Sequence, residues 1–207
     1  MKINSEKTQL LCMSSNNNLD IDAFIEHGGN KIFSGSLLKI VGFTFGARPN
    51  LDAHFFNMKR SFYARVWQIR HLKKAGIKSD KLVLLYKTLV RPVLDFVCVV
   101  YHSLLSVAQE AELERMQKHV LKIIGPNAVD SVEPLKERRL ELIDKFIEKQ
   151  RTNPRFFDRW FVPKLKNGYD TRRPEFFRED RPKTKRRQKN PLTFMRKRLN
   201  CAHAGKD

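Results

Sequence analysis

The sequence is poor in cysteine and lacks long apolar runs. Cys12, Cys98 and Cys201 are scattered over the 207 residues without a C-x-x-C pair. This usage is typical of a reducing compartment and argues against a disulfide scaffold or a zinc module. The best apolar run, 92–101, is shorter than the roughly 18 residues that a membrane helix needs, and it contains Asp95. We therefore expect an intracellular protein of the nucleus or cytoplasm, with no signal peptide and no membrane partner.

Negative charge is scarce, and positive charge is clustered. The chain carries 41 Lys and Arg against 22 Asp and Glu, a formal net charge of +19. Residues 54–91 hold ten Lys or Arg and one Asp, and residues 151–207 hold 18 Lys or Arg and six Asp or Glu. Residues 92–150 hold eight Lys or Arg and ten Asp or Glu. Clustered positive charge is typical of proteins that bind polyanions; the alternatives are a solubilising surface or a disordered basic tail.

The N-terminal quarter has strand-like alternation. We expect a hairpin of 22–26 and 31–33 around a turn at 27–30. A further strand is expected over 39–45, where Gly42 is read as a bulge or a point of close approach.

The rest of the chain has mainly helical periodicity. Expected helices cover 50–75, 79–103, 107–124 and 131–150, with one or two helical turns at 192–199. Pro92 should kink or break the second helix, because proline has no N–H to donate. Ser106 and Gln109 form a capping box before the third helix, and Ser131 should cap the fourth. The fold class is therefore mainly α with a small N-terminal β piece (α+β).

Several segments resemble the reverse transcriptases of non-LTR (LINE-like) retrotransposons of the jockey and CR1 type. Residues 4–13 read NSEKTQLLCM and residues 37–46 read LLKIVGFTFG, like the last two palm motifs of that family. Two further segments resemble the family's thumb pattern: LYKTLVRPVLDF at 85–96 and LERMQK at 113–118. Another two segments resemble the family's C-terminal end: NPL at 190–192 and MRKRLN at 195–200. The segments follow in the family's order over most of the chain.

The resemblance implies a division of the chain. Residues 1–47 would be a remnant of the palm, and 48–126 a thumb-like helical bundle. Residues 127–163 would add a C-terminal helix and a docking segment with Phe156, Phe157, Trp160 and Phe161. Residues 164–207 would form a basic, partly disordered tail.

The resemblance also implies that this chain has no catalytic residue of its own. In the family the metal-binding aspartates precede both palm motifs, and only three residues precede them here. The chain contains no Asp-Asp pair, and Asp20 and Asp22 follow the lysine motif in the wrong order, so we interpret them as turn residues. Lys7 matches the palm lysine that assists the leaving group, but it lacks metal-binding partners. No cofactor is expected here, since Mg²⁺ belongs to a complete polymerase, and polymerisation by this chain alone is not expected.

The candidate nucleic-acid contacts come partly from the resemblance and partly from helical geometry. Lys39 and Gly42 match the motif that holds the primer end in related polymerases; the alternative is an ordinary strand with a surface lysine. The expected helix 50–75 has an apolar stripe of Leu51, Phe55, Met58, Phe62, Val66 and Ile69. At about 100° per residue, a second face, about 110° from this stripe, holds residues that lie within about 80° of one another: Phe56, Lys59, Tyr63, Trp67, Arg70 and Lys74. Cations alternating with aromatics suit phosphates and base faces, although Tyr63 and Trp67 are also suited to packing against a neighbouring helix. The full set of expected contacts is Lys7, Lys39, Gly42, Lys59, Arg60, Tyr63, Trp67, Arg70, Lys73, Lys74, Lys87 and Arg91.

Three functional hypotheses follow. The first is a reverse transcriptase fragment that binds a primer–template or RNA, with the missing palm and fingers supplied by another chain. The second is a stand-alone basic module for RNA, RNA–DNA hybrid or DNA, and the third is a decayed element product without a role. The basic run at 183–189 is compatible with nuclear import.

Overall fold

The computed structural model describes residues 4, 7–13, 23–47, 51–163, 176–177, 183–184 and 188–204. It divides into two compact units, 1–97 and 98–207. The fold is mainly α with a small N-terminal β piece, as the sequence predicts. The unit boundary falls inside the predicted segment 48–126, and the finer domain boundaries stay a prediction.

Two short antiparallel hairpins begin unit 1. Strands β1 (Phe24–His27) and β2 (Asn30–Phe33) pair in the expected place, with Phe24 opposite Phe33. The expected strand over 39–45 is instead a second hairpin of β3 (Leu37–Ile40) and β4 (Phe43–Gly46). Gly42 is therefore not a bulge but a turn residue. Its φ of +81° and that of Val41, +47°, provide the left-handed two-residue turn that matches the twist of paired strands. Of the apolar run 9–13, only Leu10 makes a β-bridge, to Ser34.

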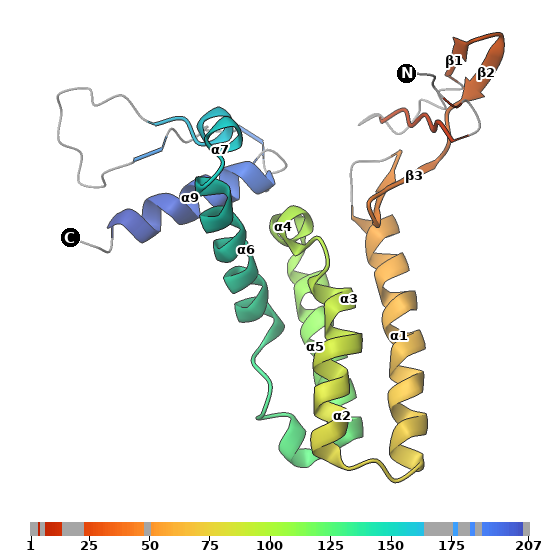
Figure 1. Cartoon of the computed structure of the whole chain (residues 1–207), viewed down its shortest axis with the longest axis vertical. Helices are drawn as coiled ribbons and strands as arrows, with labels where there is room; N and C mark the ends of the chain where they lie inside the picture. The colour runs from red at the N-terminus through yellow and green to blue at the C-terminus, as the bar shows by residue number, and fades with distance from the viewer. Residues whose placement is uncertain are drawn as a thin grey trace. The chain divides into compact units, whose positions relative to one another are not determined.

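A long helix and a returning helical segment form the core of unit 1. Helix α1 (Asp52–Lys74) contacts β4, and α2 (Ser79–Leu85), η1 (Tyr86–Val90) and α3 (Arg91–Asp95) return along it (Figure 1). The buried positions of α1 are His54, Phe55, Met58, Phe62, Val66 and Ile69. From Phe55 to Ile69 the buried positions are three or four residues apart, which confirms the predicted apolar stripe. The returning segment buries Leu82, Tyr86, Val90 and Leu94.

Pro92 does not end the second helix. Because proline cannot donate to the Thr88 carbonyl, the α-helical ladder is interrupted just before it, and η1 is a π-helical turn. The helix resumes as α3 and ends at Asp95, and Val97 has a φ of +57°. The predicted interruption of the 79–103 helix at Pro92 is thus a π-helical turn, and the helix is broken further along, at 96–97.

Unit 2 is built from helices. Its elements are α4 (Cys98–Tyr101), η2 (His102–Leu104), α5 (Val107–Ile124), η3 (Pro126–Ala128), α6 (Leu135–Arg151), α7 (Pro154–Trp160) and α9 (Pro191–Ala204). Helix α5 has the predicted bounds, and both halves of its capping box are made. Helix α9 is longer than the one or two turns expected. Most of the segment 164–190, for which poor order is predicted, lies outside the described residues.

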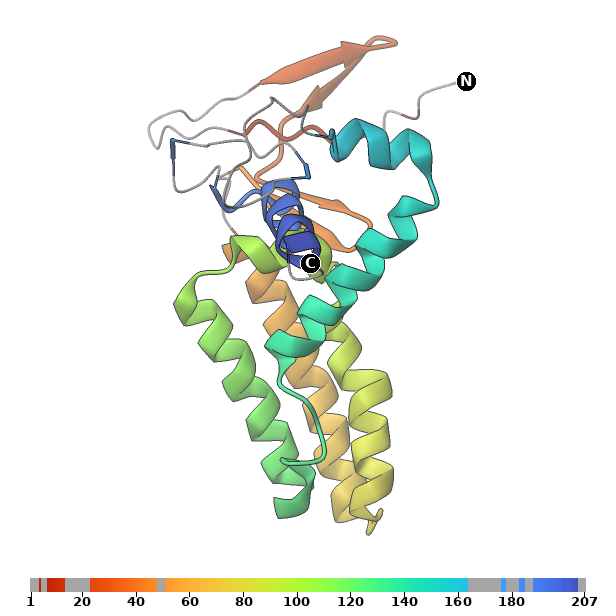
Figure 2. The ribbon, with the colours of Figure 1, turned by 90° about the vertical axis from the view of Figure 1, so that its left-hand side faces the viewer.

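A cluster of apolar side chains joins α6, α7 and α9 in unit 2. Its buried members are Ile143, Ile147, Phe161, Met195 and Leu199. Phe156, Phe157 and Trp160 pack against them. Figure 2 shows α7 following the C-terminal end of α6. The expected docking of this aromatic segment onto the helical bundle stays a prediction. The Asn200 side chain connects α9 to residues 176–177 by three hydrogen bonds. Its Oδ1 accepts from the N–H groups of Phe176 and Phe177, and its Nδ2 donates to the Phe177 carbonyl. No helix in the described ranges is both long and apolar enough to cross a membrane.

Candidate nucleic-acid interface

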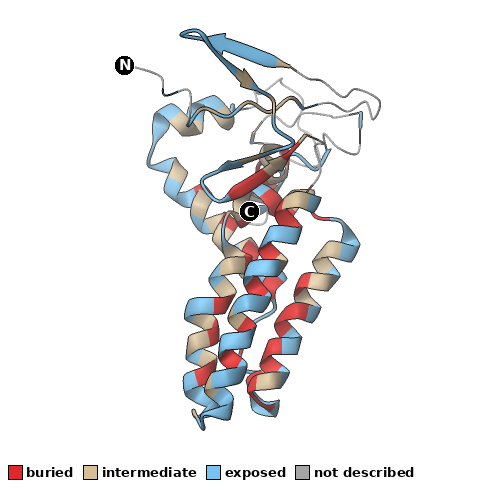
Figure 3. Ribbon diagram, turned by 90° about the vertical axis from the view of Figure 1, so that its right-hand side faces the viewer, coloured by how far each residue is buried: buried red, intermediate tan, exposed pale blue. Residues whose placement is uncertain are grey.

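One face of α1 exposes aromatic rings and cations together. Phe56, Tyr63 and Trp67 are 68%, 47% and 59% exposed, although aromatic rings usually stabilise a protein core. Figure 3 shows exposed positions recurring along the helices of unit 1. We call the following residues the α1 aromatic face: Phe56, Lys59, Arg60, Tyr63, Trp67, Arg70 and Lys74. All are exposed except Lys59, which is half-buried with its Nζ 5.7 Å from the centroid of the Phe55 ring.

Two of the exposed rings are held in place by neighbours on the same helix. The rings of Trp67 and His71 are 3.7 Å apart, and His71 Nδ1 lies 2.9 Å from the Trp67 carbonyl. A carbonyl only accepts, so His71 donates from Nδ1. Tyr63 lies edge-on to the buried Phe62 ring, with centroids 5.4 Å apart. Tyr63 and Trp67 therefore each have a ring contact that favours the orientation seen.

A groove of about 430 Å³ lies beside the β3–β4 hairpin. Its lining includes Lys39 and Gly42 from the hairpin, Asn57, Ser61 and Arg65 from α1, and Phe96, the residue that follows α3. The structure thus brings the predicted residues Lys39 and Gly42 together. Arg65 and Phe96 were not predicted for this site. Arg65 lies on the side of α1 away from the aromatic stripe, and only folding brings Phe96 to the hairpin.

Two features of its surroundings favour glycine at position 42. Its φ of +81° suits glycine, and a Cβ atom there would lie 2.5 Å from Cε1 of Phe96. The Phe96 ring therefore closes over the backbone of the hairpin tip. Phe96 is still 51% exposed, so part of its ring is open to a ligand in the groove.

A polar network holds β4 against α1 at the base of the groove. The Thr44 N–H donates to Nδ1 of His54 at 3.5 Å, and Asn57 Nδ2 donates to Thr44 Oγ1 at 3.2 Å. His54 also stacks on Phe43, with centroids 4.3 Å apart. Burial lowers the pKa of His54, which keeps the accepting nitrogen unprotonated. The groove walls are thus connected by both packing and hydrogen bonds.

The other predicted contacts lie in different surroundings. Lys7 is exposed in a turn where its N–H donates to the carbonyl and Oδ1 of Asn4. Lys87 is half-buried on η1, and Lys73 is exposed near the end of α1. The Arg91 guanidinium lies 3.7 Å from the Asp95 carboxylate, and both side chains are only 14% exposed. A nucleic-acid role for Arg91 would have to compete with this ion pair, and it stays a prediction.

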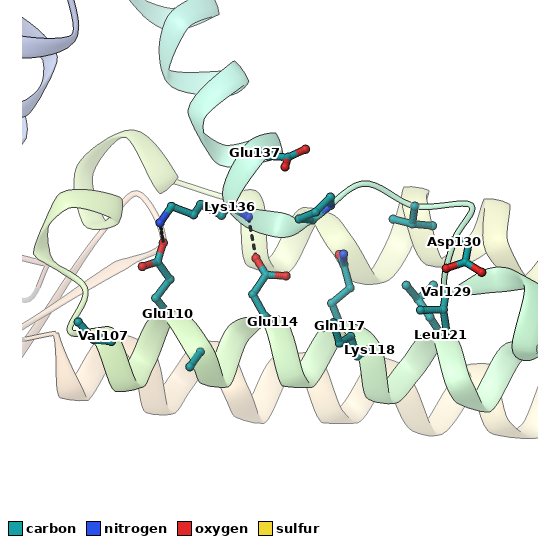
Figure 4. A pocket seen from close by; sticks show the side chains of 13 residues that line it. Val107, Glu110, Glu114, Gln117, Lys118, Leu121, Val129, Asp130, Lys136 and Glu137 are labelled. Atoms are coloured by element: carbon teal, nitrogen blue, oxygen red, sulfur yellow. Dashed lines mark hydrogen bonds and ion pairs between the residues drawn. The ribbon is translucent and has the colours of Figure 1, made fainter.

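Unit 2 has a groove of different character. This groove of about 640 Å³ lies between α5 and the segment leading into α6, and Figure 4 shows its side chains. Its charged lining is Glu110, Glu114, Asp130 and Glu137 against Lys118 and Lys136. Lys136 Nζ lies 3.4 Å from Glu110, and the Lys136 N–H donates to Glu114 at 2.8 Å. The excess of carboxylates makes this groove a poor site for phosphates.

Glu114 also explains where α6 begins. Its carboxylate accepts from the N–H groups of Leu135 and Lys136, which are the first two residues of α6. The predicted cap, Ser131, instead donates to the Ala128 carbonyl, and α6 starts at Leu135. The first residues of the predicted helix 131–150 are therefore a connection.

A buried arginine lies close to Glu110, one of the residues that line this groove. Arg139 is fully buried; its Nε donates to His102 Nδ1 at 3.3 Å, and its Nη2 lies 3.9 Å from Glu110. Burial, and then the positive charge of Arg139, lower the pKa of His102 to about 4. His102 is therefore neutral at physiological pH, as an acceptor from a guanidinium must be.

Within the described residues, no group of three or more His, Cys, Asp or Glu side chains is placed to hold a metal ion. No protein-family model matches the chain, and neither a curated protein nor a solved structure is significantly similar to it. A function for the chain must therefore be inferred from its residues and from the motifs that resemble the retrotransposon family.

Proposed function

We propose that the chain binds nucleic acid through unit 1, using the α1 aromatic face and the β3–β4 groove. The observation that carries this proposal is the α1 aromatic face, where three exposed rings share a helix surface with exposed Arg60, Arg70 and Lys74. Phosphates bind cations, and bases or sugars stack on rings, so this combination suits a polynucleotide. A surface that only had to be soluble would not need the rings.

The groove supports the same proposal. Lys39 and Arg65 supply positive charge, Asn57 and Ser61 supply hydrogen-bonding groups, and Phe96 supplies an exposed ring. The two regions would correspond to the thumb and the primer-holding hairpin of a non-LTR reverse transcriptase. Since the chain contains no Asp-Asp pair, we expect binding of a primer–template without primer extension.

Charge reversal on the face tests the proposal. The variant Arg60→Glu/Arg70→Glu/Lys74→Glu should bind an RNA–DNA hybrid at least about tenfold more weakly than the unmodified chain at low salt. The matched control is Arg115→Glu/Lys118→Glu/Lys122→Glu, which makes the same charge change at positions of α5. Equal weakening by both variants would show that only total charge matters, and unchanged affinity of the α1 variant would contradict the proposal.

A stand-alone binding module is the second candidate. The connected walls of the groove and the positioned rings of α1 favour it, because neither depends on residues outside unit 1. Equal affinity for hybrid, RNA and DNA would favour a general module, whereas a preference for hybrid would favour a thumb-like role.

A further inference from the structure

We infer that the α1 aromatic face binds single-stranded nucleic acid in preference to a duplex, with bases stacking on Phe56, Tyr63 and Trp67. This inference rests on the proposed function and specifies which form of nucleic acid the face recognises. It also differs from the hybrid preference that the thumb-like resemblance implies.

The exposed rings of α1 need exposed base faces as partners. In a duplex the base faces are covered by neighbouring base pairs, and a protein reaches only base edges and the backbone. In a single strand each base offers a face to an aromatic side chain, and this stacking tolerates any sequence. Cations alone would suffice for a duplex backbone, so the three exposed rings favour a single-stranded ligand.

The spacing of the rings favours the same ligand. At a rise of about 1.5 Å per residue, Phe56 and Tyr63 are about 10 Å apart along the axis, and Tyr63 and Trp67 about 6 Å. Phosphates follow every 3.4 Å or so along one strand of a duplex, where bases stay stacked on each other. The rings are too far apart to continue that stack. They are better spaced for bases that have separated from each other along an extended strand.

A hollow beside Trp67 is of a size that suits a single base. This hollow of about 330 Å³ is lined by Trp67, His71, Leu72, Leu89 and Val90, among others. Its volume is at the lower end of small-molecule sites, which suits one base rather than a base pair. The centroids of the His71 and Trp67 rings are 3.7 Å apart, so His71 covers part of the Trp67 ring. The Trp67 ring lies at the edge of this hollow. A base turned out of an extended strand would contact both the ring and the apolar side chains of the hollow.

Fluorescence of Trp67 tests the inference directly. The chain contains two tryptophans, Trp67 and Trp160, so Trp160→Phe leaves Trp67 as the only indole. In this background, oligo-dT and oligo-U of about 12 nucleotides should quench the emission on binding, and a duplex of the same length should bind more weakly with less quenching. Stronger quenching and tighter binding by the duplex would overturn the inference.

Ring removal gives the second readout. Tyr63→Leu and Trp67→Leu, made in the unmodified chain, should each weaken oligo-dT binding at least about fivefold, with duplex binding changed less than about twofold. Phe24→Leu/Phe33→Leu is the matched control, because it removes two exposed rings of the β1–β2 hairpin. Circular dichroism and a urea midpoint equal to that of the unmodified chain would show that each variant is folded.

The outcomes separate the two proposals. Failure of the unmodified chain to bind any of these probes at low salt would contradict the proposed function itself. Binding that is unaffected by the ring variants, or weakened equally on oligo-dT and duplex, would contradict the single-strand inference while leaving nucleic-acid binding intact.

Discussion

Replacing Gly42 by alanine should destabilise unit 1 through two effects that can be separated. The first is the backbone: a φ of +81° costs an L-residue about 1–2 kcal/mol. The second is steric, since the new Cβ would lie 2.5 Å from Cε1 of Phe96. Phe96 is half exposed and can move outward, so we place this second cost at the low end for overpacking, about 1 kcal/mol. The total expected decrease in the free energy of unfolding is about 2–3 kcal/mol.

Gly76 provides the control for the backbone effect. Its φ is +85°, and a Cβ there would meet no atom within 4 Å. Gly76→Ala should therefore cost only the backbone contribution of about 1–2 kcal/mol. Both substitutions restrict the unfolded chain to the same extent, so that contribution cancels when the two are compared.

Urea unfolding followed by Trp67 fluorescence, in the Trp160→Phe background, reports on unit 1. Gly42→Ala should lower the free energy of unfolding about 1 kcal/mol more than Gly76→Ala does. In a Phe96→Ala background this difference should disappear, as a double-mutant cycle would show. Equal decreases at the two glycines, or a difference that persists without the Phe96 ring, would refute the close contact at the hairpin tip.

Three further predictions concern unit 2. The pKa of His102 is lowered from 6.5 to about 4, so the unfolded chain protonates this histidine before the folded chain does as the pH falls. The free energy of unfolding should therefore drop by up to about 3 kcal/mol between pH 6.5 and 4, and urea titrations of His102→Asn should show a smaller drop. Asn200 is only 6% exposed and its side chain makes three hydrogen bonds, so Asn200→Ala should lower the free energy of unfolding by about 1–3 kcal/mol and speed hydrogen exchange at the Phe177 amide. An unchanged exchange rate would argue against these hydrogen bonds. Ser106→Ala removes the N-cap of α5 and should lower the free energy of unfolding, measured by thermal unfolding, by about 1 kcal/mol, whereas Ser106→Asp should be nearly neutral. Equal effects of the two substitutions would contradict the capping box.

Elements whose signals are local could be predicted from the sequence. The bounds of α5 follow from Ser106, Gln109 and Gly125, which act on their own helix, and the apolar stripe of α1 follows from periodicity. The start of α6 could not be predicted, because its N–H groups are satisfied by Glu114 from another helix. A side chain 21 residues away leaves no local signal before the helix.

The β3–β4 hairpin was missed for a different reason. Two-residue turns of this kind usually carry glycine or asparagine at the first turn position, and here that position holds the β-branched Val41. The apolar residues on both sides therefore look like one continuous strand. The groove beside the hairpin was missed with it, since Arg65 and Phe96 join Lys39 only once the hairpin lies against α1.

The candidate face on α1 was more accessible to sequence reasoning. Helical geometry alone groups Phe56, Tyr63 and Trp67, and the structure confirms that these rings are exposed. The ion pair of Arg91 with Asp95 was not predicted, although their i, i+4 spacing is a local signal for such a pair.

The salt dependence of binding tests the central claim most directly. The affinity of the unmodified chain for oligo-U should fall linearly on a log–log plot against salt concentration. The variant Arg60→Glu/Arg70→Glu/Lys74→Glu should reduce the magnitude of the slope by about 0.7 for each phosphate that the protein no longer neutralises. The α5 control variant should keep the original slope. A slope that is the same for all three proteins would contradict the account, because the cations of α1 would then bind no phosphates.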